Sequence, residues 1–185
     1  MASYSKDRHA GKIGYIFKEY YKILKKFKNI GLEELNIMYS QEADKYAALS
    51  AGEYQSFLVI GKKFLTLSKG EMRAVIAHEL GHYERLKDYS RKRFILTNLR
   101  DEEFFNYAKE GKTQGKYKHR FDMLKKWSLL HEIDADNKAL KAGYGEPMLN
   151  ILKSFTNSKE FGTMHPLLKE QMMLRMKSLE DKLRC

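Results

Sequence analysis

Three residues in the segment AVIAHELGHYERLK (74–87), His78, Glu79 and His82, form the pattern H-E-x-x-H. Two histidines four residues apart share one face of a helix, so both imidazoles can reach one Zn²⁺ ion, and the Glu between them lies beside the metal-bound water. The pattern is short and also occurs by chance in unrelated proteins. A zinc site of this kind therefore requires a helix under the histidines and a third ligand from another part of the chain.

A second group of polar residues lies in LLHEIDADNKAL (129–140). Glu132 and Asp136 are four residues apart and share one helix face, whereas His131 and Asp134 are rotated away from that face. We interpret His131 as a surface residue. A Glu that binds zinc, with a carboxylate one turn later that fixes a ligating histidine, would complete a stable site. Ordinary acidic residues on a solvated helix are the alternative.

Independent signals predict helices under both groups. Ser68 precedes Glu71 by three residues and forms the S-x-x-E capping box of a helix that begins there. A long helix is predicted from about residue 117 to 142, and Gly143 ends it. Gly81 lies inside the first helix, where Gly costs about 0.5–1 kcal/mol relative to Ala. A close backbone approach would explain it, and simple tolerance of the residue is equally consistent.

The remaining segments predict a predominantly helical α+β domain. Apolar residues with helical spacing predict an amphipathic helix within residues 1–31. Short apolar segments predict at least two strands, at 35–39 and 54–60, with a turn at 50–52. Further helices are predicted at 90–109, 148–155 and 167–183, and a linker at 110–116. We expect a single domain over residues 1–185, with a small sheet beside the helix of the first motif and a helical elaboration and linker at 90–116.

Composition limits the class of protein. A chain of 185 residues with 43% hydrophobic and 32% charged residues is long enough to form a globular core and is typical of a soluble protein. The single cysteine, Cys185, excludes a disulfide within one chain and indicates a reducing compartment. No signal-peptide core or membrane-spanning segment is recognisable, so we expect a cytoplasmic protein.

The net charge of +11 raises the question of a nucleic-acid or lipid partner. Lysines alternate with glutamates instead of forming long basic blocks, which favours a solvated surface of mixed charge and disfavours nucleic-acid binding. Peripheral contact with a membrane and self-association remain open alternatives.

Three sequence blocks together resemble the gluzincin metallopeptidases, specifically the catalytic domain of the HtpX and CAAX prenyl protease family. They are LSKGEMRAVIAHELGHYE (67–84), HEIDADNKAL (131–140) and MHPLLKEQMMLRMKSLED (164–181). Since no spanning segment is present, the chain is most similar to the soluble relatives that consist of the catalytic domain alone, the minigluzincins. The resemblance implies a zincin-like domain that hydrolyses peptide bonds in a peptide or unfolded protein.

The resemblance also implies roles for individual residues. One Zn²⁺ per chain would be held by His78, His82 and Glu132, and Glu79 would act as the general base on a metal-activated water. Asp136 would accept a hydrogen bond from His78.

Further roles are implied for the later blocks. His165 would donate to the developing oxyanion and Arg175 would support the site. The strand at 54–60 would bind an extended peptide by edge pairing. The segment from Leu167 to Cys185 could cover the zinc and keep the enzyme latent.

Two alternatives from other classes remain. A metzincin-type or SprT-like protease acting near nucleic acid needs a Gly seven residues after His78, where Arg85 stands, although Asp88 occupies the ligand position ten residues after it. A non-catalytic binding or regulatory domain with a structural zinc has no need of a general base, so the presence of Glu79 argues against it.

Overall fold

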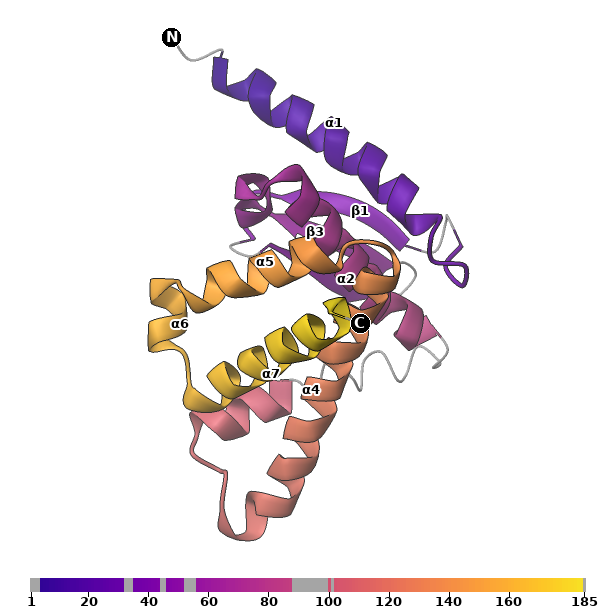
Figure 1. Cartoon of the computed structure of the whole chain (residues 1–185). Coiled ribbons are helices and arrows are strands. Elements are labelled where there is room, and N and C mark those ends of the chain that lie inside the picture. The colour runs from indigo at the N-terminus through magenta and orange to yellow at the C-terminus, as the bar shows by residue number, and fades with distance from the viewer. Residues whose placement is uncertain are drawn as a thin grey trace.

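The computed structural model describes residues 4–31, 35–43, 46–51, 56–87, 100 and 102–184. It confirms a predominantly helical α+β fold with one small sheet (Figure 1). The helices are α1 (Tyr4–Leu24), α2 (Lys69–Lys87), α4 (Lys118–Lys141), α5 (Gly145–Thr156), α6 (Lys159–Thr163) and α7 (Pro166–Leu183). The strands are β1 (Leu35–Ser40), β2 (Ala47–Ala51) and β3 (Ser56–Gly61), and short 3₁₀ turns are η1 (Lys62–Thr66) and η2 (Gly115–Tyr117).

Of the helix predicted at 90–109, the structure describes residues 100 and 102–109, and these residues are helical. Among the described residues, no helix combines the length and the apolar composition needed to cross a bilayer.

The sheet has the order β1-β3-β2, with β3 parallel to β1 and antiparallel to β2. The turn predicted at 50–52 is wrong, because Ser50 and Ala51 pair with Phe57 and Ser56 as part of β2. The prediction that the strand at 54–60 binds a peptide by its edge is also wrong, because β3 is the central strand and both its edges are paired. Among the described strands, β2 is the edge strand that contacts α2.

Helix α1 packs along the outside of the sheet and of α2 (Figure 1). Its buried face carries Ile16, Tyr20 and Ile23, and the Tyr20 hydroxyl donates a hydrogen bond to the carbonyl of Leu35 in β1. An ion pair reinforces the contact with α2, since Arg73 Nε lies 2.7 Å from a Glu19 carboxylate oxygen. The N-terminal helix is thereby anchored on the same helix that carries the H-E-x-x-H motif.

Helix α2 runs through the centre of the core. The capping box is confirmed, because the Ser68 N–H donates to the Glu71 carboxylate at 2.8 Å and the Glu71 N–H to the Ser68 hydroxyl at 3.3 Å. Gly81 meets α4 so closely that a Cβ at this position would lie 3.1 Å from backbone atoms of Ala135 and from the Lys138 side chain. Glycine at 81 therefore sets the distance between the two helices that carry the polar groups.

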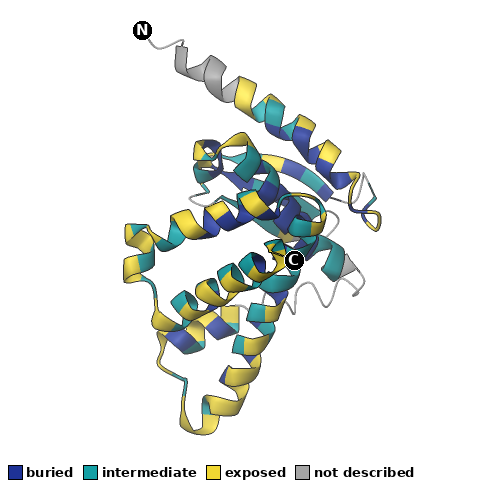
Figure 2. Cartoon of the chain, viewed as in Figure 1, coloured by how far each residue is buried: buried dark blue, intermediate teal, exposed yellow. Residues whose placement is uncertain are grey.

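The C-terminal helices complete the domain. Helix α4 ends at Gly143, whose φ of +90° is a left-handed conformation that glycine adopts without strain. Helix α7 packs on α4 and α5, and its Leu179 is 1% exposed (Figure 2). A second, smaller core lies toward the start of α4, formed by Phe104, Ala108, Phe121 and Leu124. Because α7 packs on α4 and α5 and buries Leu179, it is part of the folded core.

Candidate metal centre

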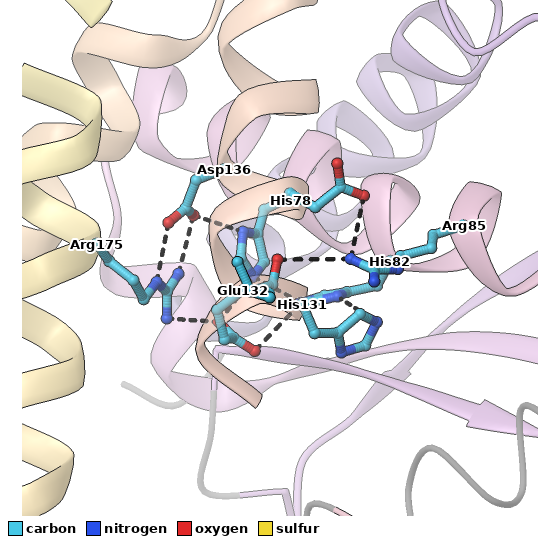
Figure 3. Close-up of polar contacts among 9 residues, drawn as sticks. His78, His82, Arg85, His131, Glu132, Asp136 and Arg175 are labelled. Atoms are coloured by element: carbon cyan, nitrogen blue, oxygen red, sulfur yellow. Dashed lines mark hydrogen bonds and ion pairs between the residues drawn. The ribbon is translucent and has the colours of Figure 1, made fainter. Parts of the chain in front are cut away.

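Three side chains from two helices converge on one point (Figure 3). On α2, the Nε2 atoms of His78 and His82 lie 3.0 Å apart. On α4, Glu132 places Oε2 3.5 Å from Nε2 of His78 and Oε1 3.4 Å from Nε2 of His82. Both histidines are buried, whereas the Glu132 side chain is 31% exposed. One side of the group therefore faces open space.

These distances fit a zinc ion. A tetrahedral Zn²⁺ with bonds of about 2.0–2.1 Å to nitrogen and oxygen holds neighbouring ligand atoms roughly 3.3–3.5 Å apart. The two histidine Nε2 atoms are 3.0 Å apart, and each lies 3.4 or 3.5 Å from a different carboxylate oxygen of Glu132, so the three side chains are close enough together to hold one ion. Three protein ligands leave a fourth position for water or substrate, which is the arrangement of catalytic zinc sites.

A charged network holds His78. Its Nδ1 lies 2.8 Å from Oδ1 of Asp136, a carboxylate that is 2% exposed. Arg175 of α7 donates to both oxygens of Asp136 at 2.9 Å, and its Nη1 lies 2.5 Å from Oε2 of Glu132. With Nδ1 beside the Asp136 carboxylate, the Nε2 atom of His78 is left for the metal.

The same network explains the pKa values of its members. Burial by itself would lower the pKa of His78, but Asp136 and Glu132 together raise it to about 10. Burial would raise the pKa of Asp136, yet Arg175 and His78 lower it to about 2. Burial would likewise raise the pKa of Glu132, which the charge of Arg175 and the two histidines hold well below its usual range. Without metal, the negative charges of the two carboxylates are therefore balanced by the positive charges of Arg175 and a protonated His78.

His82 has a different partner. Its Nδ1 lies 3.2 Å from Nε2 of His131, and the His131 ring stacks on Trp127 with centroids 5.1 Å apart. Our interpretation of His131 as a surface residue is wrong, because it is only 5% exposed. Burial, followed by the charge of His82, lowers the pKa of His131 to about 3. His131 is therefore a neutral imidazole.

The burial of His131 could have been predicted from the spacing of apolar residues in the sequence. His131 lies on the core-facing side of α4, in a row of buried residues spaced three or four apart. The row consists of Phe121, Leu124, Ser128, His131, Ala135 and Ala139.

A mostly apolar cavity of about 350 Å³ adjoins the group. Glu79 and His78 line it from α2, and Tyr46 and Ala47 line it at the start of β2. Most of the remaining wall comes from α5 and α7 and includes Met148, Ile151, Leu152, Phe155, Met172 and Arg175. Val75 of α2 and the ion pair of Lys63 with Glu160 also line the cavity. The carboxylate of the predicted general base thus lies at a space in which a substrate side chain could bind.

The structure does not bring His165 into this group. His165 is exposed at the start of α7, where its Nδ1 accepts a hydrogen bond from the Leu167 N–H at 3.3 Å, and it does not line the cavity. Asp88, the ligand position of the metzincin alternative, and Cys185 lie outside the described residues.

Two histidines on one helix, a glutamate on the next and an open ligand position define the centre of a zincin-type metallopeptidase. The sequence matches peptidase family M48 over residues 18–182, so the chain belongs to this family. A comparison with curated proteins gave no match.

Proposed function

We propose that this M48 peptidase is a zinc-dependent endopeptidase with one Zn²⁺ per chain, held by His78, His82 and Glu132. The observation that supports it most directly is the convergence of these ligand atoms beside a cavity that Glu79 also lines. When bound, the zinc ion lowers the pKa of a water molecule and polarises the carbonyl of the peptide bond to be cleaved. Glu79 accepts the proton of that water and transfers it to the leaving amine.

The substrate is an extended peptide from a peptide or unfolded protein. Among the described strands, β2 is an edge strand next to α2, and Ala47 at its start also lines the cavity. Pairing of a peptide with β2 would align it along the site, and one of its side chains would enter the cavity. Because the cavity wall is largely apolar, a large apolar side chain next to the cleaved bond is favoured.

The roles of His165 and of the C-terminal segment stay predictions. An oxyanion role for His165 requires that the start of α7 approach the zinc when substrate binds, and His165→Phe would then lower kcat. Latency would require α7 to block the site. Cutting the chain after Arg175 keeps Met172 and Arg175 in the cavity wall and removes the buried Leu179, so it also tests whether the domain folds without the second half of α7.

Parallel digestion of a peptide library by wild type and by Glu79→Gln tests the proposed function. The variant should keep its fold and zinc content and lose hydrolysis by roughly 10²–10⁴-fold, because only the proton transfer is removed. Glu146→Gln, at an exposed residue of α5, is the matched control and should cleave like wild type. Near-normal turnover by Glu79→Gln would exclude Glu79 as the base. A zinc-loaded wild type that cleaves no peptide would favour a non-catalytic zinc domain.

A further inference from the structure

The hydrogen on Nδ1 of His82 needs an acceptor. The Nε2 atom of His82 faces His78 and Glu132, so it is the atom available to a metal. A neutral imidazole that binds metal through Nε2 carries its hydrogen on Nδ1. In most zinc sites a carboxylate, a backbone carbonyl or water accepts this hydrogen. Here the facing atom is Nε2 of His131, at 3.2 Å.

The surroundings of His131 fix its ring. The side chain is buried, and its ring lies at 25° to the plane of Trp127, which is one helical turn earlier on α4. The centroid of the His131 ring is also 4.3 Å from that of His82, with the two ring planes at 51° to each other. His131 directly precedes the proposed ligand Glu132 on α4. The placement of α4 therefore determines the positions of both the ligand and the hydrogen-bond acceptor.

We propose that His131 is a positioning residue for the zinc ligand His82. Its Nε2 accepts the Nδ1 hydrogen of His82, which fixes the tautomer and the ring orientation of that ligand. For this, His131 carries its own hydrogen on Nδ1. The inference rests on the proposed zinc site and is independent of peptide hydrolysis.

A competing explanation is that His131 only fills space between Trp127 and His82. Two pairs of variants separate the explanations. His131→Phe keeps an aromatic ring against Trp127 and removes the acceptor, whereas His131→Gln removes the ring and offers a carbonyl oxygen. His131→Asn and His131→Leu are nearly equal in size, and only the first has an acceptor. His119→Phe, at an exposed histidine on the same helix, is the control.

The experiment measures zinc affinity by competition with a chelator and records the absorption spectrum of the Co²⁺-loaded full chain. His131→Phe should lower zinc affinity about 10–100-fold and alter the Co²⁺ spectrum, while His131→Gln and His119→Phe stay closer to wild type. The thermal midpoint of the metal-free chain should change little, because removing the acceptor leaves the packing in place. If His131→Phe is too unstable to assay, His131→Asn should still bind zinc about tenfold more tightly than His131→Leu.

Several results would overturn the inference. Wild-type zinc affinity in His131→Phe would show that the acceptor is unnecessary. Equal affinity of His131→Asn and His131→Leu, with identical Co²⁺ spectra, would show that only volume matters. If the wild type binds zinc and cleaves peptides while these variants behave like it, the inference alone fails. If the wild type binds no zinc, the proposed site fails together with it.

Discussion

His78 and His82 lie one turn apart on α2, yet their Nδ1 atoms meet different partners. The partner of His78 is Asp136, a carboxylate paired with Arg175, so this half of the site is charged and joins α2, α4 and α7. The partner of His82 is His131, a neutral ring stacked on a residue of its own helix. The comparison indicates that one half of the site links metal binding to the stability and charge of the whole domain, whereas the other acts on the ligand alone.

The largest effect should come from removing the charge that both carboxylates share. Arg175→Leu leaves protonated His78 as the remaining cation of the network beside Asp136 and Glu132, and breaking a buried ion pair in this way costs about 3–5 kcal/mol. Urea unfolding of the metal-free chain measures the loss, with Arg184→Leu, at an exposed residue after α7, as the control. No comparable loss should follow from His131→Phe. Equal stability of the two variants would remove the distinction between the halves.

Asp136→Asn tests the charged half directly. The variant should lower zinc affinity about 10–100-fold, as expected when the partner of a ligating histidine is altered. In contrast to His131→Phe, it should also destabilise the metal-free chain, because Arg175 keeps only one carboxylate partner. Chelator competition and urea unfolding on the same samples give both quantities. A loss of zinc affinity with unchanged stability would show that the network is not coupled to the fold.

Gly81→Ala should disturb both halves together. A methyl group at 81 would press on Ala135 and Lys138 and move α4 away from α2, at a cost of about 1–3 kcal/mol. Zinc affinity should fall as well, because Glu132, Asp136 and His131 all move with α4. Gly70→Ala is a matched control on α2, where the added methyl meets Pro147 at an ordinary 3.6 Å. The prediction fails if the two variants unfold at the same urea concentration and bind zinc equally.

The last prediction concerns the proton that zinc displaces from His78. In the metal-free chain the pKa of His78 is raised to about 10, so His78 is protonated at neutral pH and zinc must displace that proton. Zinc affinity should therefore rise between pH 7 and 9, by up to about tenfold per pH unit from this group, and level off above pH 10. Asp136→Asn should make the dependence shallower, because it removes a group that raises this pKa. Zinc titrations at several pH values measure it, and a flat profile would contradict the charged state of His78.

The parts of the site that depend on local geometry could be predicted from the sequence. The His78–His82 and Glu132–Asp136 pairs follow from residues four apart on a helix, and the capping box at Ser68 located one of those helices. The role of His131 depends on how closely α2 and α4 pack. Gly81 indicated a close backbone approach in the sequence, and its contact with Ala135 sets that distance, but the sequence did not show that α4 is the approaching element.

For the strands as well, the sequence predicted local structure but not how the elements pack. Apolar segments revealed where β1 and β3 lie, because short runs of such residues favour extended backbone. The order of strands could not be obtained in this way, because β3 pairs in parallel with β1 and antiparallel with β2. We consequently assigned peptide binding to β3, although the edge beside α2 belongs to β2.

The position of Arg175 in the chain has a consequence for biosynthesis. A ribosome releases about 5–20 residues per second from the N-terminus onward, so α2 and α4 emerge a few seconds before α7. During this interval, Glu132 and Asp136 lack the guanidinium group of Arg175, and the cavity lacks the wall that Met172 provides. The polar network around the candidate metal centre is therefore complete only after translation has passed residue 175.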